Sequence, residues 1–150
     1  MEKKMRIMVV DDEERFLVST KKLLEKKGYT VETAAGGAEA LDKLIMVQPH
    51  VIILDVKMPG MDGIETLVEI KARFPLIEVI MLTGHGTVES AVTGLKSGAF
   101  DYLIKPIDVD DLLGKAEEAY QKRRQTEEKI RVAQSRTLTA SAQDILRDTR

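Results

Sequence analysis

Acidic residues stand at the ends of two short apolar runs, and they are the side chains of this chain best suited to chemistry. The run VIIL (51–54) is followed by Asp55, and the run RIMVV (6–10) is followed by Asp11 and Asp12. Three carboxylates that converge raise one another's pKa unless a cation lies among them. Mg²⁺ prefers oxygen ligands and often shares its coordination shell with phosphate. We therefore expect a magnesium site at Asp11, Asp12 and Asp55, a set of ligands that Mn²⁺ would also fit.

Two other apolar runs end in side chains of a different kind. Thr83 follows VIML (79–82), and Lys105 follows DYLI (101–104). A lysine at such a position, beside three acids, is either their counter-ion or a ligand for a phosphoryl oxygen. A carboxylate cluster, a hydroxyl and an ammonium are therefore expected to meet at one edge of the structure.

Simpler explanations remain open for some of these residues. Asp11, Asp12 or both could cap the next helix, because acids favour the positive end of the helix dipole. Thr83 could be an ordinary turn residue before Gly84. Nucleotide binding has no support, since GHGTVE (84–89) lacks the third glycine of the dinucleotide fingerprint and no GxxxxGK loop occurs.

The elements that must position these residues alternate along the chain. Gly28 and Gly98 are predicted to end helices, while Thr87 and Asp108 are predicted to cap helix N-termini. Stretches with apolar residues at helical spacing separate five short apolar runs, which we predict to be strands. The predicted strands are residues 6–10, 29–34, 51–54, 78–83 and 101–104. Such alternation indicates a parallel sheet, and strands that are apolar throughout indicate helices on both faces.

The strand order follows from the rules for such sheets. Right-handed crossovers leave few topologies, and 2-1-3-4-5 is one of the two common orders of doubly wound sheets. We therefore predict an α/β fold with a doubly wound, five-stranded parallel sheet in this order. The order places a crevice at the carboxyl ends of the first and third strands, where Asp55 and the pair Asp11 and Asp12 would lie.

Composition limits the classes of protein to consider. The chain has 150 residues, of which 43% are hydrophobic and 32% charged, as is typical of a soluble globular domain. It has no cysteine and two histidines, which excludes disulfides and thiolate sites and leaves too few ligands for a structural zinc site. The start of the chain is too acidic for a secretory signal, so we expect a cytoplasmic protein that is not inserted in a membrane.

The last thirty residues differ from the rest in charge. Residues 121–150 contain eight Lys or Arg and four Asp or Glu, so with an overall net charge of −2 residues 1–120 are acidic. We expect one domain at residues 1–120, without direct nucleic-acid binding, and an appendage at 121–150. The appendage is predicted to be a solvated basic tail, a linker, an extension of the last helix, or a short helix capped at Ser141; its heptads are too polar to predict a coiled coil.

Four motifs together resemble a known family. VVDDE, LDVKMPGMDG, MLTGHG and DYLIKP agree in order and spacing with the receiver domain of two-component response regulators, over about residues 5–120. The segment GHGTVESAVTGLKSGAFDYLIKPID further resembles receivers attached to sigma-54-dependent transcriptional activators. The resemblance implies a flavodoxin-like fold and a phosphorylation-activated switch that is not a turnover enzyme.

The resemblance also implies a role for each motif residue. Asp55 would be the phosphoacceptor, with a sensor histidine kinase or a phosphotransfer protein as donor. Asp12, Asp55 and the backbone carbonyl of Lys57 would hold Mg²⁺, with Asp11 as a further ligand or acting through water. Lys105 would bind a phosphoryl oxygen.

Further features concern the response to phosphorylation. Thr83 and Tyr102 match the family's switch pair, and the Lys105-Pro106 peptide bond would be cis, as X-Pro bonds can be. Lys57 and His85 match positions that tune the lifetime of the phosphoryl group, unless they are ordinary surface residues.

Phosphorylation would change the face formed by the fourth helix, the fifth strand and the fifth helix. That face would then control a partner or an output domain, or form a homodimer.

Two other functions remain to be weighed. A magnesium-dependent phosphohydrolase with an aspartyl nucleophile usually has a second Asp two residues later, where this chain has Lys57. A binding module with a vestigial site would form no stable acyl phosphate.

Overall fold

The computed structural model describes residues 5–148, in which five strands and five helices alternate. The strands are β1 (Arg6–Val10), β2 (Thr30–Ala34), β3 (Val51–Leu54), β4 (Glu78–Thr83) and β5 (Asp101–Ile104). The helices are α1 (Glu14–Lys26), α2 (Gly37–Leu44), α3 (Gly63–Arg73), α4 (Val88–Lys96) and α5 (Val109–Asp148). Four predicted strands have the predicted bounds, whereas β2 begins at Thr30 rather than at Tyr29.

The strands form one parallel sheet in the order β2-β1-β3-β4-β5, which confirms the predicted fold. Every residue of β3 and β4 is buried. Their side chains alternate between two faces, so each face needs a cover of helices.

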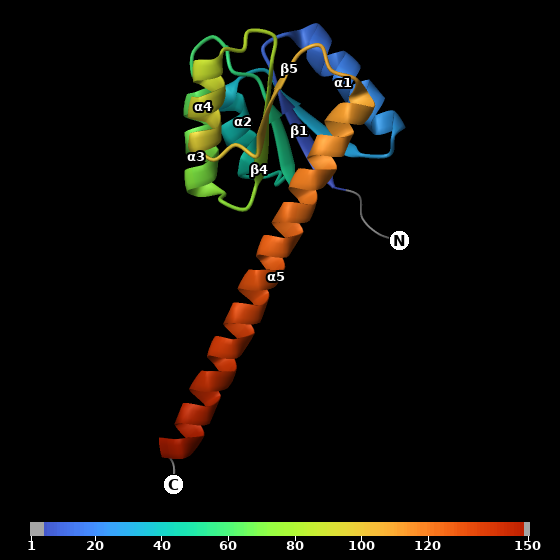
Figure 1. Ribbon diagram of the computed structural model, residues 1–150. Coiled ribbons are helices and arrows are strands. Elements are labelled where there is room, and N and C mark those ends of the chain that lie inside the picture. Colours follow the sequence, from blue (N-terminus) through green and yellow to red (C-terminus); the bar gives the residue numbers. More distant parts are fainter. Residues whose placement is uncertain (1–4, 149–150) are drawn as a thin grey trace.

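Two separate hydrophobic clusters lie on the two faces of the sheet. One joins Met8, Ile52 and Met81 with α2 and α3, and the other joins Val9, Ile53 and Leu82 with α1 and α5. Figure 1 shows the corresponding layers, with α1 and α5 on one side and α2, α3 and α4 on the other. The central strands are therefore held from both sides, which fixes the positions of their carboxyl ends.

The predicted helix ends have the predicted chemistry. Gly28 and Gly98 adopt φ values of 93° and 107°, which L side chains rarely adopt. Thr87 caps α4 in a capping box with Ser90, and the carboxylate of Asp108 accepts a hydrogen bond from the N–H of Asp110 at 3.1 Å.

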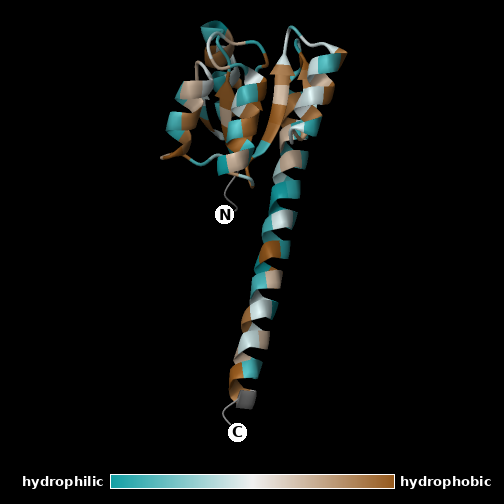
Figure 2. Ribbon diagram, turned by 90° about the vertical axis from the view of Figure 1, so that its left-hand side faces the viewer, coloured by the Kyte–Doolittle hydropathy of each residue, from teal (hydrophilic) through white to brown (hydrophobic). Residues whose placement is uncertain are grey.

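Helix α5 continues well beyond the sheet. It runs without a break to Asp148, so Ser141 lies inside it and does not cap a separate helix. Residues 127–146 are all exposed, and Figure 2 shows hydrophilic and hydrophobic residues mixed along this part of α5. The division into a domain at 1–120 and an appendage at 121–150 stays a prediction.

Contacts at the amino edge of the sheet fix α5 where it leaves the domain. Arg123 donates a hydrogen bond from Nη1 to the carbonyl of Pro49 at 3.1 Å, and the rings of Tyr120 and His50 meet edge to face at 4.8 Å. Burial, Arg6 and Arg123 lower the pKa of His50 to about 4. Its neutral Nδ1 can therefore accept the backbone hydrogen bond of Arg6 at 2.9 Å.

A buried carboxylate reinforces the same place. Glu78, at the start of β4, is only 5% exposed, and its Oε2 lies 3.7 Å from the ammonium of Lys122 on α5. An uncompensated buried charge would be costly, so this pair further couples the helix to the sheet. None of the helices in residues 5–148 combines the length and the apolar character that crossing a bilayer requires.

Candidate functional site

The predicted site residues lie at one edge of the sheet because the strands are parallel. Asp11 directly follows β1, Asp55 follows β3, Thr83 ends β4 and Lys105 follows β5. β1 and β3 are neighbours, so the two buried carboxylates, Asp11 and Asp55, lie beside each other.

The acidic residues form one cluster. One oxygen each from Asp11, Asp12 and Asp55 lie within 4.8 Å of one another. Asp11 and Asp55 are 1% and 4% exposed, whereas Asp12 is exposed. The alternative that the Asp11-Asp12 pair caps the next helix is wrong, because the residue at the N-cap of α1 is Glu13.

Asp11 is held in place by two hydrogen bonds. Its Oδ1 accepts from the N–H of Glu13 at 2.9 Å, and its Oδ2 accepts from the Nζ of Lys105 at 2.6 Å. Lys105 is 14% exposed at its side chain and also lies 4.0 Å from the centre of the Phe16 ring. The ammonium is thus the counter-ion of Asp11 and remains accessible to a ligand at the edge of the site.

The electrostatics of Asp55 indicate a need for positive charge. Burial raises the pKa of its carboxyl, and the neighbouring charge of Asp11 raises it further. The Thr83 hydroxyl, Lys105 and the N–H of Val56 act in the opposite direction, the last through a hydrogen bond of 2.8 Å. The net effect is a raised pKa, so Lys105 alone does not balance the two buried acids.

The donor set fits a hard divalent cation. All the side chains of the cluster offer carboxylate oxygens, which Mg²⁺ prefers, and the exposed Asp12 leaves an open side for water or a phosphoryl group. Asp12, Asp55 and Asp11 could thus hold Mg²⁺, with the carbonyl of Lys57 close by in the chain.

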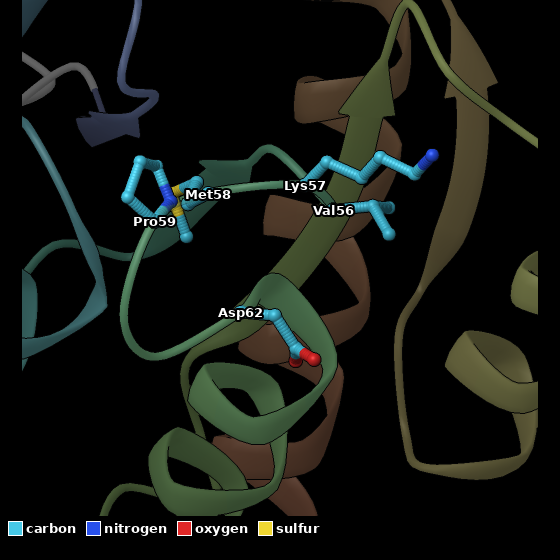
Figure 3. A pocket seen from close by; sticks show the side chains of 5 residues that line it. All are labelled: Val56, Lys57, Met58, Pro59 and Asp62. Carbon is cyan, nitrogen blue, oxygen red and sulfur yellow. The ribbon is translucent and has the colours of Figure 1, made fainter.

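Lys57 and His85 lie at the surface. This position fits both predicted alternatives, a role in the lifetime of the phosphoryl group and an ordinary surface residue. Lys57 lines an open pocket of about 450 Å³ with Val56, Met58, Pro59 and Asp62. Figure 3 shows the Lys57 side chain extending away from Met58 and Pro59. The side chain of His85 is exposed in the loop after β4.

Thr83 and Tyr102, the predicted switch pair, make contacts that the sequence did not reveal. Thr83 is fully buried, and its Oγ1 accepts a hydrogen bond from the N–H of His85 at 3.1 Å. The hydroxyl of Tyr102 lies 2.6 Å from the Oγ of Ser90 on α4. Ser90 was missed as a site residue. The only signal for it was its place three residues after the predicted cap Thr87. The Lys105–Pro106 peptide bond is cis, in agreement with the resemblance.

Gly63 lets α3 begin directly against Asp55. Its N–H donates to the carbonyl of Val56 at 2.7 Å. A Cβ at this position would overlap the carbonyl oxygen of Asp55 and would lie 2.7 Å from the Cα of Val56. Because the obstructing atoms are backbone, they could not move without moving Asp55.

We expect Gly63→Ala to destabilise the fold by about 2 kcal/mol or more, since the added methyl group overpacks a buried site. Urea unfolding measures the effect. Gly114→Ala is the matched control, because nothing lies within 4 Å of its Cβ; alanine there should stabilise α5 by up to about 1 kcal/mol. Equal unfolding midpoints for the Gly63 variant and the parent would contradict the packing argument.

Comparison with known families decides what kind of domain this is. The family described as "Response regulator receiver domain" matches residues 7–117. The chain belongs to this family. The recognition from the four motifs is therefore confirmed, and the chain is a receiver of two-component signalling. Receiver domains bind Mg²⁺ in an acidic pocket, to which the Asp11, Asp12 and Asp55 cluster corresponds.

Curated relatives include transcriptional regulators. The receiver is 39% identical over 122 residues to the DNA-binding transcriptional regulator NtrC of Escherichia coli strain K12, covering 79% of this chain and 26% of the relative. It is 44% identical over 113 residues to the transcriptional regulatory protein ZraR of the same strain, covering 75% of this chain and 26% of the relative. The receiver thus spans about a quarter of the length of these relatives.

Solved structures agree with the fold. A CheY-like receiver domain protein from Methanospirillum hungatei JF-1 has a TM-score of 0.78 and 37% identity, covering 81% of this chain and 98% of that chain. NtrX from Brucella abortus, solved in complex with ATP, has a TM-score of 0.77 and 33% identity, covering 83% of this chain and 28% of that chain.

Proposed function

We propose that this receiver accepts a phosphoryl group on Asp55 from a histidine kinase or a phosphotransfer protein, and that the reaction depends on Mg²⁺. The observation that carries the proposal is the meeting of Asp55 with Asp11, Asp12, Thr83 and Lys105 at the carboxyl edge of the sheet. The family membership supports phosphorylation-dependent signalling as the general role.

The residues of the site suit each part of phosphoryl transfer. A carboxylate oxygen of Asp55 would form the new bond to phosphorus, while the bond from phosphorus to the donor breaks and the donor keeps the electron pair. Lys105 and the hydroxyl of Thr83 would stabilise the negative oxygens of the transferred group. Bound Mg²⁺ would supply further positive charge between the carboxylates and that group.

The nucleophile gains its position from the fold. Asp55 is held by the N–H of Val56 at 2.8 Å and by the start of α3 at Gly63. Positioning of this kind lowers the entropic part of the barrier. Such a site supports phosphorylation of its own residue and later hydrolysis, rather than turnover of a separate substrate.

The response would pass to the face of α4, β5 and α5. Phosphate adds about −1.5 to −2 charges and strong hydrogen-bond acceptors. The hydroxyl of Thr83 would move toward the phosphoryl group, and the side chain of Tyr102 would change its position as a result. Exposed apolar side chains already mark this face: Val88, Val92, Leu95 and Ile104 are exposed by 83, 46, 47 and 51%. A partner, an output domain or a second copy could bind there.

Intact-mass measurement tests the proposal. The receiver is incubated with a small phosphodonor, with and without Mg²⁺, and the mass of one phosphoryl group should be added only with Mg²⁺. A phosphohydrolase would instead consume many equivalents of the donor without keeping the group. No added mass in either condition would overturn the proposal in favour of a binding module.

We expect phosphorylation to favour a homodimer through the face of α4, β5 and α5. The exposed apolar side chains of α4 give that face a driving force for association. Sedimentation velocity before and after treatment with the phosphodonor measures it, with Val92→Glu as the variant that should prevent the dimer. A monomer in both states would mean that Tyr102 and its face serve a different partner.

Lys57 and His85 are expected to set the lifetime of the phosphoryl group. Side chains that lean over the site exclude the water that would attack in line. Lys57→Ala and His85→Ala should still be phosphorylated, but the decay should change severalfold at fixed Mg²⁺. Lys96→Ala, on the exposed end of α4, is the control and should decay like the parent. Parental decay in both site variants would assign Lys57 and His85 to the ordinary surface.

A further inference from the structure

Ser90 takes part in two structures at once. Its N–H donates to Oγ1 of Thr87 at 3.0 Å and its Oγ accepts from the N–H of Thr87 at 3.1 Å, which forms the capping box of α4. The same Oγ lies 2.6 Å from the hydroxyl of Tyr102 on β5. One side chain thus joins the first turn of α4 to the aromatic member of the switch pair.

One arrangement of the hydrogens uses the acceptors around Ser90 well. A serine hydroxyl has one hydrogen, and the Oγ of Ser90 lies 3.1 Å from the carbonyl of Thr87, which can only accept. When Ser90 donates to this carbonyl, the short contact must be a hydrogen bond from Tyr102 to Ser90. Ser90 Oγ then accepts from Tyr102 and from the N–H of Thr87, and the hydroxyl of Thr87 is a further donor at 3.1 Å. The position of Tyr102 is therefore tied to the capping box.

Gly86 allows the ring of Tyr102 to lie close to the loop before α4. A Cβ at Gly86 would overlap Cδ1 of Ile104 and would lie 3.1 Å from the hydroxyl oxygen of Tyr102, whereas one at Gly94 would make only an ordinary contact, 3.7 Å from Cδ2 of Tyr102. Gly94 is the one residue buried in α4. The other residues of α4 are half-buried or exposed, so the capping box is the main hydrogen-bonded structure at its first turn.

The loop before α4 also connects Ser90 to the phosphoacceptor. Thr83 acts on the pKa of Asp55 and accepts the N–H of His85 at 3.1 Å. His85 stands two residues before Thr87, the cap of α4. If the Thr83 hydroxyl turned toward a phosphoryl oxygen, the N–H of His85 would lose or change its acceptor. Any resulting movement of the loop would reach Thr87 and the capping box next.

We propose that Ser90 is a positioning residue of the switch, which holds Tyr102 against α4 while the capping box is intact. Tyr102 can then change place only together with the first turn of α4. The inference deepens the proposed function and rests on phosphorylation of Asp55 for its consequence. The hydrogen bond itself exists without phosphorylation, so it can be tested separately.

A double-mutant cycle with Ser90→Ala and Tyr102→Phe tests the proposal in the full chain. Each single variant should release the ring or its hydroxyl and speed phosphorylation by a small phosphodonor by about fivefold, the factor that corresponds to one net hydrogen bond. The double variant should be no faster than either single one, because both changes remove the same contact. Ser90→Thr keeps a hydroxyl and should restore the parental rate.

Two results would overturn the role of Ser90 in positioning Tyr102. If Ser90→Ala speeds phosphorylation by the same factor in the Tyr102→Phe background, Ser90 acts only as a cap and the proposal is overturned. The ring signals of Tyr102 in labelled protein without phosphodonor give the second readout; they should move in Ser90→Ala and not in Ser90→Thr. Unchanged ring signals in Ser90→Ala would also overturn it, whereas loss of phosphorylation in the parent would overturn only the proposed function.

Discussion

Replacement of Asp55 by asparagine is expected to abolish covalent phosphorylation. The amide is a poor nucleophile, yet it keeps the shape of the side chain and an oxygen that can accept the N–H of Val56. Incubation with a phosphodonor and Mg²⁺ followed by intact-mass measurement checks the result. Asp62→Asn is the matched control, because Asp62 caps α3 through the N–H of Glu65 and asparagine caps equally well. Labelling that persists at the parental level in Asp55→Asn would refute the assignment.

The same variant should be more stable than the parent without Mg²⁺. Burial and Asp11 raise the pKa of Asp55 in the folded state, so between the unfolded and the folded pKa the folded state binds more protons. Ionised Asp55 therefore does not destabilise the parent's folded state at a pH below the unfolded pKa of about 4, and it destabilises that state fully at a pH above the folded pKa. The gain in melting temperature of Asp55→Asn should grow as the pH rises from about 4 to neutrality.

Replacement of Asp12 by alanine is expected to weaken Mg²⁺ binding by at least about tenfold, the loss seen even when a metal site loses an outer partner. Asp12 is exposed, so the fold should persist. Removal of one of three like charges should also raise the melting temperature slightly without the ion.

Melting curves at increasing Mg²⁺ measure the change in affinity. The parent should be stabilised by the ion, as any ligand of the native state stabilises it. Glu14→Ala removes the same charge from the first turn of α1 and should keep the full shift. A parental Mg²⁺ response in Asp12→Ala would exclude Asp12 as a ligand.

The strand ends could be predicted because a buried parallel strand is apolar from end to end. VIIL and its neighbours have no polar residue inside, so Asp55 and Thr83 mark where the strands stop. Parallel direction then places all such residues at one edge, and no side-chain detail is needed for that step.

The partners of these residues could not be predicted in the same way. The bond from Lys105 to Asp11 spans 94 residues, and a strand-end lysine suits a counter-ion and a phosphate ligand equally. The contact of Ser90 with Tyr102 depends on the distance between α4 and β5, and on the absence of a side chain at Gly86, where a Cβ would lie 3.1 Å from the Tyr102 hydroxyl. The length of α5 was left open because exposed helical turns show no apolar period to recognise.

The anchoring of α5 at Arg123 has a rotational consequence. A helix turns by about 100° and rises about 1.5 Å with each residue. Every side chain beyond Arg123 therefore has a fixed angular position around the helix axis relative to the sheet. One residue inserted between 124 and 129 would swing Leu138 and Ile145 by about 100° around the axis without touching Asp55. An insertion of seven residues would return both side chains to within about 20° of their original angle around the axis. Whatever binds the far part of α5 therefore meets a surface whose angle is set at the other end of the helix, by Pro49 and Glu78.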